Sequence, residues 1–218
     1  MKNHTVRLIN EHTNIGLEQL LNSGLEVDAV ITQFDNSYFP NGVATNKDIE
    51  DFGFKLRILC HQGAHLYFVV NPIDMTKVIE GLTAAGLDYK NMLVIPTTGE
   101  HEDTTHECFS TNYLTTAQKY VLFFSNGRTR SMNWTKIMGG EETNQYPANW
   151  STWFCGNNIE MFVALMKIAT NHADVVLDPF MGTGDVGVAA IQADRHYIGI
   201  EWSHLFRETS IRLEITGE

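Results

Sequence analysis

Residues 174–202 read DVVLDPFMGTGDVGVAAIQADRHYIGIEW, and this stretch decides the fold. An apolar run that predicts a buried strand ends at a glycine-rich turn, a helix-forming run follows, and a second apolar run ends at Glu201. Gly182, Gly184 and Gly187 spell G-x-G-x-x-G between the first strand and the helix. Such a strand, glycine turn, helix and strand with a terminal acid predict a βαβ unit that binds a nucleotide-containing ligand.

Two features argue against a nicotinamide dinucleotide, and hence against an oxidoreductase. Asp178 and Asp185 flank the turn, and their carboxylates would repel a pyrophosphate. A ligand with an ammonium and a sulfonium, such as S-adenosylmethionine, would be attracted by them. A dinucleotide fold also usually begins with this unit, whereas here few residues follow Glu201. A structural alternative is that the glycines only allow the helix to pack closely on the strands.

The alternation of strand-like and helix-like runs extends through the preceding sequence. Strands are predicted at 5–9, 27–34, 65–71, 92–98 and 118–127, and helices at 16–24, 49–63, 74–86 and 157–171. Strands separated by helices indicate an α/β fold, with a mainly parallel sheet covered by helices on both faces. We expect one domain over residues 1–218, with a small insertion at about 126–156.

Composition and charge exclude several classes of protein. A hydrophobic content of 43% and a charged content of 19% are typical of a folded soluble protein. No run reaches the ~18 apolar residues of a membrane span, and the N-terminus has no signal-peptide core. Three cysteines without a C-x-x-C pair predict a reduced, cytoplasmic setting, bacterial or in the host cell of a virus.

The net charge of −11 argues against nucleic-acid binding through bulk electrostatics, but it allows a local basic face. Arg128, Arg130 and Lys136 form the candidate patch. His101, His106 and Cys108 lie close together in the sequence. Their spacing matches no common zinc pattern and lacks a fourth ligand, so we predict an exposed polar loop and no metal site.

DPFMGTG (178–184) and YIGIE (197–201) resemble the cofactor motifs of the DNA amino-methyltransferases, in the circular order that places the catalytic segment first. The resemblance covers most of the chain. It implies a Rossmann-like methyltransferase fold, S-adenosylmethionine as cofactor, and transfer to an exocyclic amine of a DNA base, adenine favoured over cytosine. It further implies a set of cofactor-binding residues: Asp178, Phe180, Gly182 and Gly184 in the loop, and Glu201 on the ribose hydroxyls.

The same resemblance places catalysis within VITQFDNSYFP, residues 30–40. Members carry Asp-Pro-Pro-Tyr or a close variant there: the acid accepts hydrogen bonds from the amine, and the aromatic stacks on the flipped base. Strict register gives Gln33 to Asn36, whereas a slip of two residues gives Asp35 to Tyr38. The slipped register makes Asp35 the amine acceptor and Tyr38 the stacking platform.

Both registers lose the two prolines, so two alternatives stay open. One is a catalytically lapsed methyltransferase that binds DNA or a partner protein without transferring a methyl group. The other is a polar loop without chemistry at the end of the strand. A homodimer or a partner subunit is compatible with each hypothesis.

Overall fold

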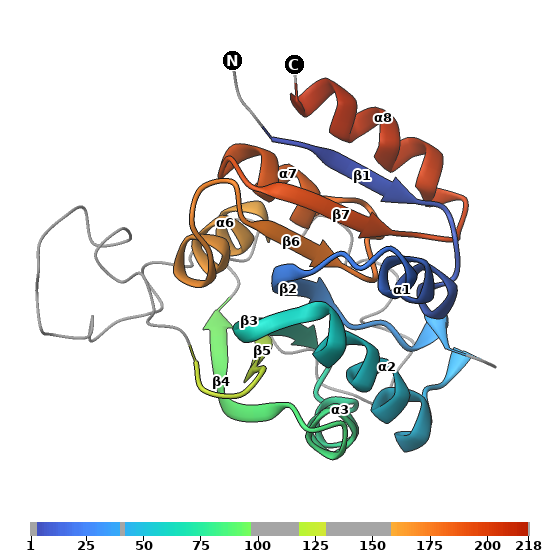
Figure 1. Cartoon of the computed structure of the whole chain (residues 1–218), viewed down its shortest axis with the longest axis vertical. Coiled ribbons are helices and arrows are strands. Elements are labelled where there is room, and N and C mark those ends of the chain that lie inside the picture. The colour runs from blue at the N-terminus through green and yellow to red at the C-terminus, as the bar shows by residue number, and fades with distance from the viewer. Residues whose placement is uncertain (1–3, 40–41, 97–117, 130–157, 218) are drawn as a thin grey trace, which may run out of the picture.

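The computed structural model describes residues 4–39, 42–96, 118–129 and 158–217. Its core is a seven-stranded sheet in the order β1-β7-β6-β2-β3-β5-β4 (Figure 1). The strands are β1 (Val6–Ile9), β2 (Val27–Gln33), β3 (Cys60–Val70), β4 (Asp88–Pro96), β5 (Gln118–Ser125), β6 (Val175–Asp178) and β7 (His196–Ile200). Only β5 runs antiparallel to its neighbours β3 and β4, so the predicted mainly parallel α/β sheet is confirmed.

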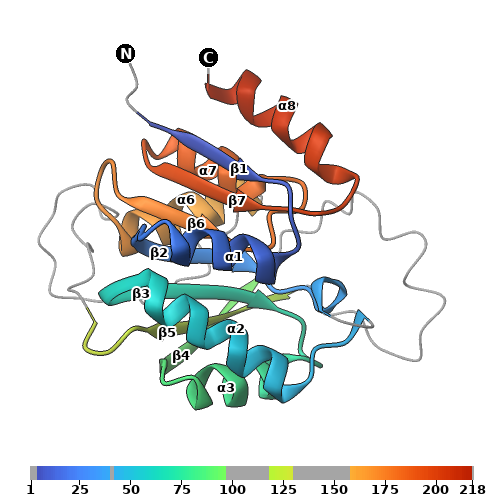
Figure 2. The same ribbon diagram turned by 45° about the vertical axis from the view of Figure 1, so that its right-hand side comes forward.

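Helices cover both faces of the sheet (Figures 1 and 2). One face carries α1 (Thr13–Asn22), α2 (Asn46–Leu59) and α3 (Met75–Ala84), and the other carries α6 (Asn158–Ala169), α7 (Asp185–Gln192) and α8 (Leu205–Gly217). Alternate residues of a strand enter opposite cores: Leu66 and Phe68 face the first set of helices, whereas Tyr67 and Val69 face the second. None of the described helices is long and apolar enough to cross a membrane.

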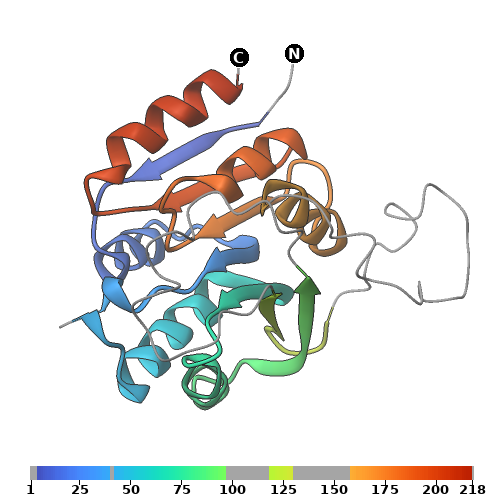
Figure 3. The same cartoon turned by 180° about the vertical axis from the view of Figure 1, so that it is seen from behind.

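The chain leaves β6 and β2, which are neighbours, in opposite directions. From β6 it passes through α7 to β7, and from β2 it passes through α2 to β3, on the other side of the sheet (Figure 3). Where the connections that follow two neighbouring strands go to opposite sides of the sheet, a crevice forms at the carboxyl ends of these strands, and open α/β sheets bind their ligands in such crevices. The fold therefore directs attention to the residues that follow Gln33 and Asp178.

Several boundaries differ from prediction: α1 begins at Thr13, β3 at Cys60 and β4 at Asp88, each at least three residues before the predicted start. The helix predicted at 49–63 begins at Asn46, because Thr45 and Asp48 form a capping box, and it ends at Leu59. Gly63 was predicted to end it, but this glycine lies within β3 at a φ of 83°, where its N–H donates to the Asn126 carbonyl. A further helix, α8, follows the last strand and was not predicted.

Several predictions fall on residues outside the described ranges. The insertion at about 126–156 is described only to residue 129. His101, His106 and Cys108, with Arg130 and Lys136, are not described at all.

Candidate functional site

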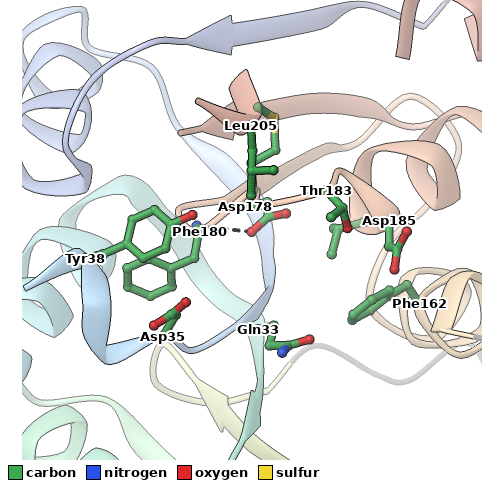
Figure 4. A pocket seen from close by; sticks show the side chains of 12 residues that line it. Gln33, Asp35, Tyr38, Phe162, Asp178, Phe180, Thr183, Asp185 and Leu205 are labelled. Atoms are coloured by element: carbon green, nitrogen blue, oxygen red, sulfur yellow. Dashed lines mark hydrogen bonds between the residues drawn. The ribbon is translucent and has the colours of Figure 1, made fainter. Parts of the chain in front are cut away.

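A cavity of about 220 Å³ opens at the carboxyl ends of β2 and β6 (Figure 4). Five of the seven predicted site residues line it: Asp35, Tyr38, Asp178, Phe180 and Gly182. Gly184 and Glu201 lie behind this lining. Two segments about 140 residues apart in the sequence thus share one pocket, as Figure 4 shows for Tyr38 and Asp35 opposite Asp178.

The loop after β2 is held in a defined conformation. Asp35 is exposed, and its Oδ1 accepts a hydrogen bond from the Ser37 N–H at 2.8 Å, which caps the short 3-10 helix η1 (Asn36–Tyr38). The Asn36 amide donates to Asp74 Oδ1 at 2.6 Å and accepts from the Ala44 N–H at 3.1 Å. Because Asn36 is held away from the cavity, Asp35 and Tyr38 are the members of this loop that face a ligand.

Aromatic packing against Phe180 also holds the loop that follows β2. Phe34 and Phe39 are buried, and their ring centroids lie 5.7 and 5.9 Å from that of Phe180 on the cofactor loop. Tyr38 meets the same ring edge to face at 5.1 Å. Phe180 therefore joins the two predicted loops through apolar contact, besides lining the cavity.

Tyr38 and Glu201 are hydrogen-bonded to each other. The Tyr38 hydroxyl donates to Glu201 Oε2, which also accepts from the Gly182 N–H at 2.8 Å, while Oε1 accepts from the Ser203 N–H at 2.7 Å. Burial raises the pKa of Tyr38, and the bond to Glu201 raises it further. Burial also opposes ionisation of Glu201, but its hydrogen bonds outweigh this and lower the pKa of the carboxyl below its usual value. Glu201 is thus an ionised acid, fully buried by protein contacts.

Asp178 ends β6 at the centre of a buried network. Thr32 Oγ1 donates to Asp178 Oδ1 at 2.6 Å, and the Tyr197 hydroxyl donates to Oδ2 at 3.1 Å. Burial raises the pKa of Asp178 to about 7, in spite of these hydrogen bonds, and the charge of Glu201 adds to the rise. Thr32 and Tyr197, which sequence reasoning missed, therefore position the carboxylate and couple β2 and β7 to it.

This pKa predicts a pH-dependent stability. Between about pH 4 and pH 7 the unfolded Asp178 is ionised while the folded one holds its proton, so the free energy of unfolding falls as pH rises through this window. The slope should reach roughly 1 kcal/mol per pH unit. Urea unfolding of the parent and of Asp178→Asn at pH 4.5, 5.5, 6.5 and 7.5 (about one unit apart) measures the difference. A difference between the two proteins that does not change with pH would contradict the assignment.

The glycine-rich turn is shaped for close approach. Gly182 and Gly184 have φ values of 51° and 83°, in the left-handed region that favours glycine. The third glycine of the pattern serves packing, because a Cβ on Gly187 would lie 2.8 Å from Leu213 of α8. Sequence reasoning missed α8, which also holds the turn: Thr209 Oγ1 donates to the Gly182 carbonyl, and Arg212 donates to the Thr183 carbonyl, each at 2.7 Å.

The acidic side chains at the cavity suit a cationic ligand, whose charge would favour the ionised form of Asp178. Asp35, Asp178 and Asp185 line it, and Glu201 lies directly behind Gly182. Among the described residues no three His, Cys, Asp or Glu side chains gather in a way that could hold a metal ion.

Arg128 does not share the edge of the sheet that carries the cavity. It follows β5, whose last residue, Ser125, pairs with His65 in the middle of β3, and the next residue, Asn126, donates to the Cys60 carbonyl at the beginning of β3. The cavity lies at the opposite end of β3's neighbour β2. The basic patch stays a prediction, because Arg130 and Lys136 lie outside the described ranges.

The family model described as DNA methylase, for enzymes of the N6 and N4 type, matches residues 57–212. The chain belongs to the DNA methylase family. The resemblance inferred from the two cofactor motifs, DPFMGTG and YIGIE, is thereby confirmed. S-adenosylmethionine is the methyl donor of this family, so the predicted cofactor is confirmed by family membership.

Curated relatives match this DNA methylase family member over a short segment. The type II methyltransferase M2.MboI of Moraxella bovis is 48% identical over 44 residues, 20% of this chain, and M.Cfr9I of Citrobacter freundii is 48% identical over 42 residues. The chain spans only 16% and 14% of the lengths of these two relatives.

Solved structures extend the likeness to the whole fold. The M1.HpyAVI–SAM complex superposes with a TM-score of 0.71 at 16% identity, over 96% of this chain and 99% of that one. The cytosine-N4-specific PvuII DNA methyltransferase superposes with a TM-score of 0.69 at 13% identity, over 95% and 86%. At such identities these matches confirm the Rossmann-like methyltransferase fold of this family member.

Proposed function

We propose that this protein transfers a methyl group from S-adenosylmethionine to the exocyclic amine of a DNA base, adenine ahead of cytosine. One observation carries the proposal: Asp35 and Tyr38 line the same cavity as Asp178, Phe180 and Gly182. Methyl transfer requires the amine and the methyl donor to meet within one pocket. The loops that follow the neighbouring strands β2 and β6 line one cavity, which supports that requirement.

Each residue has a role that its environment supports. The Asp35 carboxylate accepts the hydrogens of the amine, which concentrates electron density on the nitrogen for attack. Its Oδ1 already accepts from Ser37, so the loop orients the carboxylate before a base arrives. The part of the cavity that would hold the cofactor is lined by Asp178, Phe180 and Gly182. Gly184 does not line the cavity, but its positive φ gives the turn its shape. When bound, the cofactor supplies an electrophilic methyl group on a sulfonium.

The slipped register of the catalytic loop fits this proposal better than the strict one. In the strict register Asn36 would take the place of the aromatic, but its side chain is bonded to Asp74 and Ala44. In the slipped register the aromatic is Tyr38, which lines the cavity with Asp35. Gln33 also lines the cavity and is the strict-register counterpart of the acid. Variants at both positions distinguish the registers.

Glu201 and Tyr38 cannot perform their proposed roles while bonded to each other. Glu201 is proposed to accept hydrogen bonds from the ribose hydroxyls, yet its Oε2 is occupied by the Tyr38 hydroxyl. Tyr38 is proposed to stack on a base, yet its ring packs on Phe180. Ribose binding that replaces the Tyr38 hydroxyl would release the ring, so cofactor would bind before the base stacks.

The lapsed methyltransferase is the second candidate, because the same Tyr38–Glu201 bond also describes a site that is closed on itself. Incubation with labelled S-adenosylmethionine and DNA from a methylation-deficient strain, followed by nucleoside analysis, tests the two. We expect labelled N6-methyladenine, or N4-methylcytosine if the base is cytosine. Calorimetric binding of the cofactor without any labelled nucleoside would favour the binding protein.

A further inference from the structure

Lys119 places a half-buried cation near the cavity. It is the second residue of β5, and because β5 runs antiparallel, its first residues lie beside the carboxyl end of β3, where Tyr120 pairs with Val70. The Lys119 ammonium donates to Oδ1 of Asn158, the first residue of α6. The other end of that amide, Nδ2, lies 3.4 Å from Asp185 Oδ2. Asp185, the first residue of α7, lines the cavity, and so does Phe162, which lies one turn after Asn158 on α6.

The nearby acid already has a partner of its own. Arg212 Nη1 lies 2.8 Å from Asp185 Oδ1, so Asp185 forms an ion pair with α8. Within the described ranges Lys119 forms no ion pair, and its ammonium contacts the neutral amide of Asn158. Burial lowers the pKa of Lys119, although the charge of Asp185 opposes this. A partly desolvated ammonium with donors to spare is stabilised by an anion.

The cofactor of the proposed function brings such an anion. Its amino-acid end carries a carboxylate beside the ammonium, and the charged residues that line the cavity in the described part of the chain are the acids Asp35, Asp178 and Asp185. These acids suit the ammonium and the sulfonium but repel the carboxylate. We propose that Lys119 of β5, which contacts the first residue of α6, binds the carboxylate of the cofactor's amino-acid end. The dipole of α6 adds a favourable partial positive charge at its N-terminus, beside Asn158.

The inference rests on the proposed function, and two ligands separate them. S-adenosylhomocysteine carries the amino-acid end, whereas 5′-methylthioadenosine has the same adenosine and sulfur without it. In calorimetric titrations Lys119→Met should bind S-adenosylhomocysteine at least about tenfold more weakly, because a charged hydrogen bond is lost. Its affinity for 5′-methylthioadenosine should stay within about twofold of the parent, since the lost contact does not concern that ligand.

Two matched variants control the measurement. Lys90→Met removes a lysine of β4 that pairs with Asp88, and should leave both affinities unchanged. Lys119→Arg keeps the charge and should retain most of the affinity for S-adenosylhomocysteine. Equal loss for both ligands in Lys119→Met would indicate a structural role and overturn the inference, as would no loss at all. A parent that binds neither ligand would overturn the proposed function and the inference together.

Discussion

Replacing Asp35 by asparagine is expected to slow methyl transfer at least about 100-fold while changing cofactor affinity less than about twofold. An asparagine can still accept the Ser37 N–H, so the η1 loop should keep its conformation. What is lost is the negative charge that accepts the hydrogens of the attacking amine. Since that charge acts on the base, the cofactor should bind as before.

Single-turnover transfer of a labelled methyl group measures the rate, and calorimetry with S-adenosylhomocysteine measures the affinity. Gln33→Ala is the matched control, because Gln33 also lines the cavity but belongs to the strict register. We expect a loss of less than about tenfold there, as for a contact that does not take part in the chemistry. Full activity in Asp35→Asn together with inactivity in Gln33→Ala would assign the amine to the strict register instead.

The fold could be predicted because periodicity and composition specify it locally. Residues 174–202 contain a complete βαβ unit within one stretch of sequence, and the structure reproduces it as β6, α7 and β7. Gly63 shows where local signals mislead: a glycine with positive φ ends many helices, but here it serves an irregularity at the start of a strand. The position of Gly63 is decided by its bond to Asn126, 63 residues away, which no local pattern contains.

The site was predictable as a set of residues but not as a network. Asp178 and Glu201 could be singled out from their positions at strand ends, whereas their partners Thr32, Tyr197 and Tyr38 lie on other elements. The role of α8 was missed for the same reason, since Thr209 and Arg212 act on the turn only through tertiary contact. The basic patch stays a prediction: the charge of Arg128 was visible in the sequence, whereas its place at the end of β5 depends on the direction of that strand.

Glu201→Gln is expected to weaken cofactor binding by roughly 10- to 100-fold, the range for loss of one charged hydrogen-bond acceptor. Glutamine can still accept the Gly182 N–H through its carbonyl oxygen, so the turn should survive. The ribose hydroxyls then meet a neutral acceptor. Calorimetry with S-adenosylhomocysteine measures the change, and unchanged affinity would remove Glu201 from the ribose site.

Tyr38→Phe is expected to act in the opposite direction on the same measurement. It removes the hydroxyl that occupies Glu201 Oε2 but keeps the aromatic ring, so the cofactor should bind about 2- to 10-fold more tightly. Tyr38→Ala should also free Glu201, yet it should weaken productive base binding by roughly 1–3 kcal/mol because the stacking surface is gone. A Tyr38→Phe protein with weaker cofactor binding would mean that the hydroxyl holds Glu201 in place and does not compete for it.

The double variant decides between these two meanings. If Tyr38 competes with the ribose for the charge of Glu201, the gain from Tyr38→Phe depends on that charge, and it should disappear in the Glu201→Gln background. If the hydroxyl only orders the side chain, the two changes should lower affinity together and their effects should overlap. Opposite signs in the single variants and no gain in the double would support an ordered site, in which cofactor binding releases the ring that then receives the base.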